Sequence, residues 1–232
     1  MESGIIKDEN EIRAMLRAAQ IIDDTYDAVL ETIKEGDTEK EIAEFIYDFV
    51  LMQGASGVSF DTIVAFGEGC ADIHHEPTDR KLEKGMLVMI DMGAVYDGYC
   101  SDFTRTFAFG EINEKQRKIY DIVYKSQKLG VEAAKVGAVC GDVDKACRDY
   151  IDNKGYGDTF IHTTGHGVGK VVHEMPRVAK NSEDVLESNM VITIEPGIYL
   201  EGEMGVRIED MVIVGREGVV SRHPTELIVI NR

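Results

Sequence analysis

Two stretches of the chain end an apolar run on an acidic residue and carry a second acid shortly afterwards. In the first stretch the run 88–90 leads to Asp91, and Asp102 follows eleven residues later. In the second the run 191–194 leads to Glu195, and Glu209 follows at the end of the segment 206–209. Such runs are typical of buried strands, where a carboxylate without a partner is too costly to persist. A metal cation is the obvious partner for these acids.

His166 lies between the two stretches, in the glycine-rich segment 164–169. Four carboxylates and one imidazole make an oxygen-rich donor set, which suits Mn²⁺, Co²⁺, Fe²⁺ or Zn²⁺ in a site for two divalent cations. Two cations that share a water lower its pKa toward neutrality, so the expected reaction is a hydrolysis. Any one acid alone would more often be a solvated turn residue, and glycines around His166 could mark only a turn. The joint pattern favours the metal site.

Three competing catalytic motifs are absent from the sequence. The glycine-rich segment 165–171 lacks the Ser or Thr and the spacing of a phosphate-binding loop. His173 and Glu174 begin a zinc-peptidase pattern, but Arg177 stands where the second histidine belongs. The chain also has no Gly-x-Ser-x-Gly sequence for a serine nucleophile.

Helical periodicity and helix-ending glycines define the elements that must position these residues. Apolar residues recur at steps of three and four over 9–35, which predicts an amphipathic helix that stops at Gly36. A second helix is predicted over 37–52, with an N-cap at its start and Gly54 after its end. The segment 59–67 is predicted to form a strand, and a loop with His74, His75 and Pro77 follows it.

The second half of the chain repeats this order, with helices predicted over 114–134 and 142–153. Gly36 and Gly137 are 101 residues apart, as are Gly54 and Gly155. The two His-x-x-Pro sequences, at 74–77 and 173–176, are 99 residues apart, and the acid-x-Gly sequences at 91–93 and 195–197 are 104 apart. These matches indicate an ancient duplication. We expect one domain over 1–232, built from halves of about 1–112 and 113–232, of the α+β class with antiparallel strands.

Composition limits the class of partner and the location. With 25 basic and 43 acidic residues the chain carries a formal charge of -18, which disfavours nucleic acid and anionic membranes as partners. Its four cysteines show neither CxxC spacing nor a disulfide framework, so they are predicted to be reduced thiols. The N-terminus lacks the pattern of a secretion signal, and no apolar run approaches the roughly 20 residues needed to span a bilayer. A cytoplasmic location is expected.

Several motifs together resemble the pita-bread metallopeptidases, and within them the Xaa-Pro aminopeptidase and prolidase branch. The similarity extends from about Ile6 to Ile230 and includes Pro-Thr-Asp-Arg at 77–80, Ser-Asp-Phe-Thr-Arg-Thr at 101–106, Thr-Gly-His-Gly-Val-Gly at 164–169 and Val-Arg-Ile-Glu-Asp at 206–210. The resemblance implies two pseudo-symmetric halves around a curved antiparallel sheet with flanking helices. It also implies an exopeptidase that uses a dinuclear metal centre.

The resemblance further implies a role for each residue of the site. The implied metal ligands are Asp91, Asp102, His166, Glu195 and Glu209, with Asp102 and Glu209 bridging the two cations. Glu195 would also act as general base, and His74 and His173 would steady the scissile amide and its oxyanion. His162 would be a further pocket histidine, and Arg207 would hold the carboxylates in place. The alternative for these last four residues is a loop histidine or a surface arginine without such a role.

Two departures from the family pattern affect these expectations. Ile73 stands where the branch usually has proline, and His75 adds a second imidazole beside His74. His74 is the better candidate because it keeps the three-residue distance to Pro77. Full-length members usually carry an N-terminal domain, and this chain begins at the catalytic domain, as a short natural form or a truncated piece would. The preferred length of the substrate is therefore left open.

The resulting hypothesis is a dinuclear-metal-dependent exopeptidase that hydrolyses the bond between an N-terminal residue and a following proline, by attack of a metal-bridging hydroxide. Mn²⁺ is the favoured metal, the partner is a peptide with proline in second position, and a homodimer is the family's habit. Methionine aminopeptidase is the alternative within the enzyme class, because it shares the five ligands. A catalytically silent peptide-binding module of the same fold is the alternative outside it, although such modules typically lose ligands and none is missing here.

Overall fold

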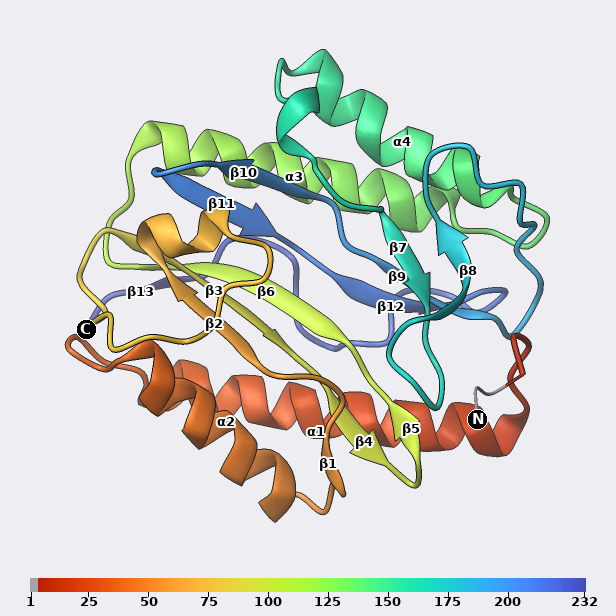
Figure 1. Ribbon diagram of the computed structural model, residues 1–232, viewed down its shortest axis with the longest axis horizontal. Helices are drawn as coiled ribbons and strands as arrows, with labels where there is room; N and C mark the ends of the chain where they lie inside the picture. Colours follow the sequence, from red (N-terminus) through yellow and green to blue (C-terminus); the bar gives the residue numbers. More distant parts are fainter. Residues whose placement is uncertain (1–3) are drawn as a thin grey trace.

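The four helices of the described residues form two pairs on opposite sides of the strands (Figure 1). The computed structural model describes residues 4–232. One pair is α1 (Glu9–Thr32) and α2 (Glu39–Met52), and the other is α3 (Glu114–Ala133) and α4 (Cys140–Asn153). The first three helices each begin with a capping box, in which two side chains satisfy free backbone N–H groups at the helix start. The four predicted helices are confirmed, with ends that shift by at most three residues.

The strands form two four-stranded sheets with shorter extensions. The first sheet, in the order β13-β6-β3-β2, contains β2 (Ile63–Phe66), β3 (Met86–Met92), β6 (Phe103–Phe109) and β13 (Val229–Ile230). The second, in the order β12-β9-β7-β8, contains β7 (Gly165–Gly167), β8 (Glu174–Val178), β9 (Val191–Ile194) and β12 (Asp210–Ile213). The extensions are β1 (Gly57–Val58), β4 (Ala94–Tyr96), β5 (Tyr99–Cys100), β10 (Gly197–Leu200) and β11 (Met204–Arg207). Two short 3-10 helices, η1 (Gly67–Ala71) and η2 (Gly157–Thr159), complete the elements.

The two sheets meet where β6 of the first half lies beside the end of β11 and the start of β12. Thr104 and Glu209 form a bridge there, and the Glu209 N–H donates to the Thr104 carbonyl over 3.0 Å. The Arg207 N–H donates to Thr106 Oγ1 over 3.2 Å. Since β3 and β6 pair in the first half as β9 and β12 do in the second, equivalent strands meet at the seam. The predicted α+β arrangement of two similar halves is confirmed.

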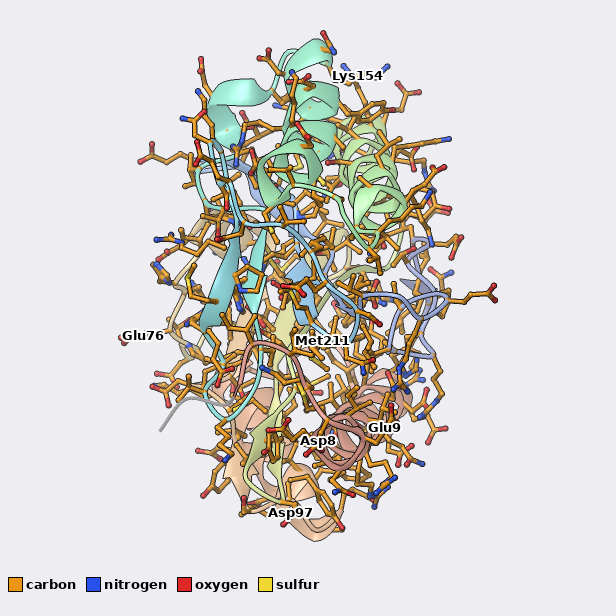
Figure 2. The ribbon with its side chains drawn as sticks, turned by 90° about the vertical axis from the view of Figure 1, so that its right-hand side faces the viewer. Asp8, Glu9, Glu76, Asp97, Lys154 and Met211 are labelled. Carbon is orange, nitrogen blue, oxygen red and sulfur yellow. The ribbon has the colours of Figure 1, made fainter. Side chains whose placement is uncertain are left out.

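Side chains on the sheets alternate between cores. Val88 and Ile90 of β3 belong to the core shared with α1 and α2, whereas Leu87 joins the core beneath α3 and α4. Ile192 and Ile194 of β9 join that second core as well. Burying each such side chain contributes about 1.5–3 kcal/mol, so the helices are held to the sheets mainly by apolar contact. Figure 2 shows these layers edge-on, with the strands between the two helix pairs.

Two details differ from the sequence prediction. The strand predicted over 59–67 is wrong in its length, because regular pairing with β3 covers only β2, Ile63–Phe66. The partner strand is interrupted at Gly93, between the end of β3 and the start of β4. The chain is closely packed there, since a Cβ atom on Gly93 would lie 2.0 Å from Ser59 Oγ. The C-terminal strand β13 pairs parallel with β6, whereas all other pairs are antiparallel in the described residues.

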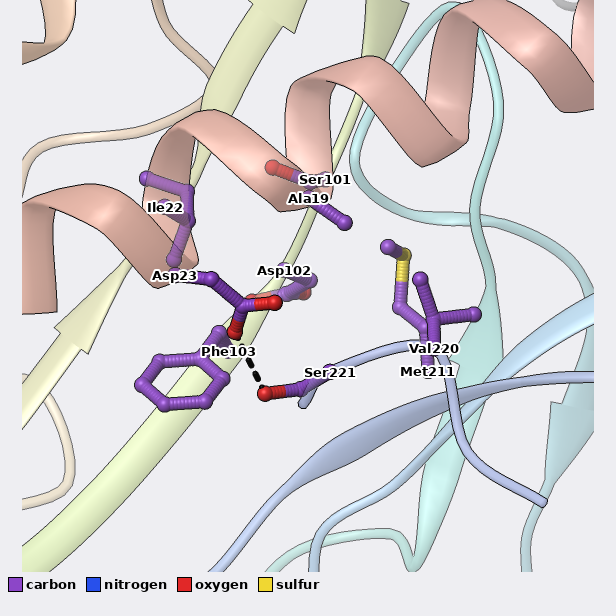
Figure 3. A pocket seen from close by; sticks show the side chains of 9 residues that line it. All are labelled: Ala19, Ile22, Asp23, Ser101, Asp102, Phe103, Met211, Val220 and Ser221. Atoms are coloured by element: carbon purple, nitrogen blue, oxygen red, sulfur yellow. Dashed lines mark hydrogen bonds between the residues drawn. The ribbon is translucent and has the colours of Figure 1, made fainter. Parts of the chain in front are cut away.

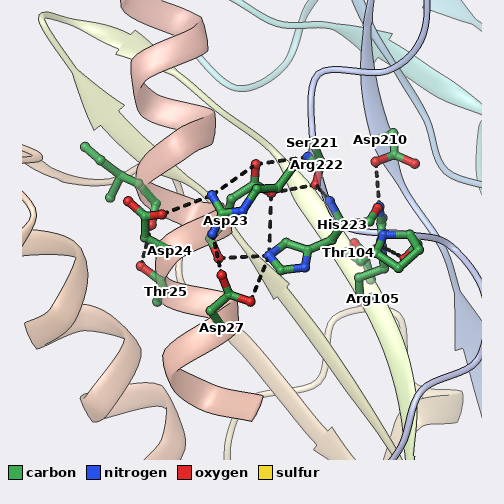
Figure 4. A network of polar contacts seen from close by, with 12 residues as sticks. Asp23, Asp24, Thr25, Asp27, Thr104, Arg105, Asp210, Ser221, Arg222 and His223 are labelled. Atoms are coloured by element: carbon green, nitrogen blue, oxygen red, sulfur yellow. Dashed lines mark hydrogen bonds and ion pairs between the residues drawn. The ribbon is translucent and has the colours of Figure 1, made fainter. Parts of the chain in front are cut away.

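The C-terminal segment is tied to α1 by a polar network (Figure 4). Ser221 Oγ donates to Asp23 Oδ1 over 2.6 Å, and His223 Nε2 donates to the Asp23 carbonyl over 2.9 Å. On the other side of this segment, the buried Arg105 pairs with Asp210 over 2.7 Å. The network fixes the end of the second half to the first helix of the chain.

All four cysteines are free and buried. None of the described helices has both the length and the apolar composition that crossing a bilayer requires.

Candidate metal centre

A pocket of about 710 Å³ opens at the seam between the two halves. The nine side chains that the sequence analysis places at the site all line this pocket: His74, Asp91, Asp102, His162, His166, His173, Glu195, Arg207 and Glu209. The first three come from the first half of the chain and the other six from the second. The pocket therefore exists only because the two halves pack together.

Strand pairing places the acids side by side. Asp91 on β3 pairs directly with Thr104 on β6, and Thr104 bridges to Glu209 of the other half. Asp102 lies two residues before Thr104, so the two side chains share one face of the extended chain. Glu195 follows β9, and its N–H donates to the carbonyl of Thr164 over 2.8 Å. Residues more than 100 positions apart in the sequence thus meet within one pocket.

The donor atoms at the centre are close enough to share a cation. Asp102, His166 and Glu209 each offer one atom, and these three atoms lie within 4.8 Å of one another. The Asp91 Oδ1 atom is buried and accepts no hydrogen bond in the described structure. Burial and the neighbouring acids raise the pKa of Asp102 and of Glu209 well above the usual range of a carboxyl. Clustered buried acids with an orphaned oxygen fit divalent cations, which would supply the missing positive charge.

His166 points its imidazole ring toward the same acids. Its Nε2 atom lies 3.2 Å from Glu195 Oε1 and 3.5 Å from Asp102 Oδ2. Burial lowers the His166 pKa, but the hydrogen bond to Glu195 and the charges of the two acids outweigh it and raise the pKa to about 9. Burial raises the pKa of Glu195, yet the hydrogen bond and charge of His166 lower it to about 2. Nε2 is thus the ring nitrogen that faces the acids.

Arg207 anchors the opposite side of the acid cluster. Its Nη2 donates to Asp91 Oδ2 over 2.6 Å, and its Nε donates to Thr104 Oγ1 over 3.2 Å. The Thr104 hydroxyl in turn donates to Glu209 Oε2 over 2.6 Å. With only 3% of its surface exposed, Arg207 holds two carboxylates in fixed orientations, one directly and one through Thr104.

A second chain of hydrogen bonds leads from Arg207 to His162. The Arg207 Nη1 atom donates to the Tyr199 hydroxyl over 3.0 Å. His162 Nδ1 lies 2.7 Å from the carbonyl of Thr163, which can only accept, so Nδ1 carries the proton. Burial lowers the pKa of His162, and its neutral ring then accepts the Tyr199 O–H at Nε2 over 2.7 Å. These contacts fix the His162 tautomer.

Thr104 and Tyr199 were missed by the sequence analysis. Both follow a singled-out residue by two positions along an extended chain, Thr104 after Asp102 and Tyr199 after Gly197. Alternation of side chains in strands could have indicated that they face the same side.

The candidate substrate-facing histidines lie on the outer part of the pocket. His74 and His173 are exposed and come from different halves. The ring of His173 packs edge-on against that of His166, with centroids 4.3 Å apart. His75 lies 2.8 Å from Glu39 through its Nε2 atom, so its ring is held by a partner within the protein. This geometry favours His74 over His75 as the residue that is free to contact a substrate.

Packing on the remaining sides supports the pocket wall. Asp102 also borders a cavity of about 10 Å³ beneath α1, together with Asp23 and Ser221 (Figure 3). That space suits about one water molecule. On the other side, Arg148 of α4 donates to the carbonyls of Phe160 and His162, each over 2.9 Å, and so holds the segment that leads to His166.

Two similar halves bring buried carboxylates and one imidazole together at their seam, a donor set that could hold metal ions. The chain belongs to metallopeptidase family M24, whose model matches residues 13–216. It is 46% identical over 222 residues to the Xaa-Pro dipeptidase of Pyrococcus furiosus, a match that covers 96% of this chain and 64% of the relative.

Solved structures show the same fold. The Xaa-Pro dipeptidase from Bacillus anthracis superposes with a TM-score of 0.95 at 45% identity, over 97% of this chain and 64% of that one. The X-Pro aminopeptidase from Thermotoga maritima superposes with a TM-score of 0.94 at 38% identity, over 97% of this chain and 65% of that one. The pita-bread fold and the Xaa-Pro branch expected from the sequence are thereby confirmed. The chain spans slightly less than two thirds of the length of these relatives.

Proposed function

We propose that this chain is the catalytic domain of a metal-dependent exopeptidase that hydrolyses the bond between an N-terminal residue and a following proline. The observation that carries this proposal is the single pocket that joins all nine candidate residues from both halves. Relatives named as Xaa-Pro dipeptidases support the choice of substrate. Methionine aminopeptidase is not favoured, because the similar proteins belong to the Xaa-Pro branch.

In this proposal the five donors hold two divalent cations, with Mn²⁺ as the favoured metal: Asp91, Asp102, His166, Glu195 and Glu209. When bound, the cations would supply Lewis acidity and a water of lowered pKa. Arg207 and Thr104 orient the carboxylates through the hydrogen bonds described above. The buried acids and the orphaned Asp91 oxygen fit this role.

The other roles follow from where the side chains lie. Glu195, beside His166, would take a proton from the attacking water and deliver it to the leaving nitrogen of the peptide. His74 from the first half and His173 from the second would donate to the scissile amide and its oxyanion. Partial desolvation of its ring lowers the pKa of His173, which favours the neutral N–H donor. His162, held neutral by Tyr199 and Thr163, would orient the substrate.

The decisive experiment is a rate survey with purified protein. With Mn²⁺ or Co²⁺ the protein should cleave Xaa-Pro dipeptides and tripeptides, and a chelator should abolish the activity. Met-Gly-Xaa peptides serve as the comparison, and faster cleavage of these would favour the methionine aminopeptidase alternative. Turnover that a chelator leaves unchanged would overturn the metal-dependent mechanism. A protein that binds no metal at saturating Mn²⁺ would instead favour the silent binding module.

A cytoplasmic location and a homodimer stay predictions. Light scattering of the purified chain measures the second directly.

A further inference from the structure

Glu39, the first residue of α2, is a buried acid outside the set assigned to the metal centre. Its side chain has 0% of its surface exposed. All the hydrogen bonds that the described structure gives this carboxylate come from backbone N–H groups, one hydroxyl and one imidazole. A carboxylate buried this completely must be well satisfied to be tolerated, so its partners indicate what it holds.

Three of these partners belong to the loop that carries His74. Glu39 Oε2 accepts from His75 Nε2 over 2.8 Å, from the Thr78 N–H over 2.9 Å and from the Thr78 hydroxyl over 2.6 Å. The other oxygen, Oε1, accepts from the Phe66 N–H over 2.8 Å at the end of β2. One side chain thus joins α2, the first sheet and the loop 72–80.

The loop needs such an anchor because it has no regular pairing of its own. Residues 72–80 form neither helix nor strand. The backbone at the start of α2 adds two contacts, from the Glu39 N–H to the Arg80 carbonyl and from the Lys40 N–H to the Thr78 carbonyl, each over 3.2 Å. Both lie at the far end of the loop. Near His74 the loop bonds to its own Asp72, from the His74 N–H to Oδ1 over 3.0 Å and from the His75 N–H to the carbonyl over 3.3 Å. The Glu39 side chain adds the bonds that join His75 and Thr78 to α2.

The contact with His75 also determines the direction of His74. A carboxylate can only accept, so His75 Nε2 must carry a proton and its ring is fixed on Glu39. Gly69 packs against this ring, since a Cβ there would lie 3.0 Å from His75 Cε1. With His75 held inward, the adjacent His74 is exposed and lines the pocket.

We infer that Glu39 is a positioning residue for the proposed peptidase: it clamps the loop 72–80 through His75 and Thr78 and so aims His74 at the substrate. The inference rests on the proposed function for the role of His74. The clamp itself is a property of the folded chain and can be tested separately.

The first test measures the clamp without any substrate. Hydrogen exchange of the metal-loaded protein should be faster across 72–81 in the Glu39→Gln variant. Glutamine places an NH₂ group, itself a donor, where one carboxylate oxygen accepted hydrogen bonds. This group opposes the donors on the side that it faces, either those of His75 and Thr78 or the Phe66 N–H. Exchange in α3 should not change. Glu41→Gln is the matched control, since Glu41 lies on the same helix start but its side chain bonds only to Thr38 in the described structure, through exposed hydrogen bonds. Unchanged exchange across 72–81 in Glu39→Gln would overturn the inference.

The second test is a double-mutant cycle with Xaa-Pro peptides. Glu39→Gln should lower kcat about 10- to 100-fold with little change in KM, as expected when a catalytic group is misplaced by about 1 Å. In a His74→Ala background the same change should cost less than about threefold, because the group to be aimed is gone. If Glu39→Gln lowers kcat by the same factor in both backgrounds, Glu39 has a general structural role and the inference is contradicted.

Partner variants keep the inference testable if Glu39→Gln does not fold. His75→Gln retains an N–H donor toward Glu39 and should keep most of the activity, whereas His75→Ala should lose it to the extent predicted for Glu39→Gln. Equal activity of the two variants would contradict the clamp. If the wild-type protein cleaves no Xaa-Pro peptide, the proposed function fails, and the exchange experiment still decides whether Glu39 holds the loop.

Discussion

Glu195 is the residue on which the proposed proton transfer depends most directly. We expect Glu195→Gln to lower kcat about 10²- to 10⁴-fold at saturating Mn²⁺, because an amide cannot accept and return a proton. The fold should survive, since the amide retains the shape of the side chain. Steady-state rates on an Xaa-Pro dipeptide, with circular dichroism as the check on folding, measure both.

Glu201→Gln is the control for this variant, because Glu201 lies in an exposed turn of the same half. It should match the wild-type rate. A Glu195→Gln variant with wild-type kcat would remove Glu195 from the proposed proton pathway.

The cysteines give a prediction about pH. Burial raises the pKa of Cys70 and of Cys147 to about 12, from an ordinary value of 9.0. A higher thiol pKa means less thiolate at a given pH, here by roughly a thousandfold, and the thiolate is the reactive form. Iodoacetamide at pH 8 should therefore leave both residues unmodified in the native protein and modify them in urea, as read by mass spectrometry. Rapid labelling of either one in the native state would contradict their burial.

Individual residues were predictable where their type carries the chemistry, and much less so where they only hold another residue. Asp91, Asp102 and Glu209 stand out because the same layout of an apolar run, an acid and a second acid occurs twice in the chain. Thr104 does not stand out, because its bond to Glu209 joins residues 105 positions apart, and sequence spacing within one half says nothing of that contact. Glu39 resembles an ordinary acid in the first turn of a helix, so its burial could be learned only from the structure.

At the scale of elements, periodicity located all four predicted helices because each has an apolar face and a glycine or a cap near an end. The start of α4 was less clear, because Val139 offers no side-chain cap. Strands were harder, since their extent depends on the partner strand. The break opposite Gly93 shortens β2, and the parallel pairing of β13 joins the chain end to a strand some 120 residues earlier. Neither relationship leaves a local pattern in the sequence.

The contact between α3 and the elements beside it gives a prediction about packing. A Cβ atom on Gly130 would lie 2.4 Å from Cys147 Sγ and 2.7 Å from Ile194 Cγ2. Alanine is the better helix former by up to about 1 kcal/mol, but forcing atoms into a filled core costs about 1–3 kcal/mol. Gly130→Ala should therefore lower the free energy of unfolding, measured by urea denaturation.

A double variant separates the clash from other effects of this substitution. Cys147→Ala removes the nearer of the two atoms, so Gly130→Ala should cost less in that background than alone. If Gly130→Ala stabilises the protein by the full helix propensity, the close contact between α3 and α4 is not as described.

At the scale of the whole molecule, the metal centre lies on the seam between the two halves. Backbone contacts such as the bridge between Thr104 and Glu209 join the halves at the seam. The seam also carries four acids whose charges repel one another. The halves are also linked by the C-terminal network on α1. Cations bound between the acids would replace this repulsion with attraction across the seam, so metal should stabilise the fold as well as enable catalysis.

Thermal unfolding with and without metal tests this coupling. A ligand at about 1,000 times its Kd adds roughly 4 kcal/mol to the stability of the state that binds it. For a chain of this size that corresponds to a rise in Tm of roughly 8–16 °C when Mn²⁺ replaces chelator.

Because the chain carries a net charge of -18, cations could also stabilise it without a specific site. Asp149→Asn, in an acidic group on α4 away from the seam, should retain the full rise in Tm, whereas Glu209→Gln should lose most of it. An equal rise in Tm in both variants would show general charge screening. No rise in Tm in the wild-type protein would show that the acid cluster does not bind the metal.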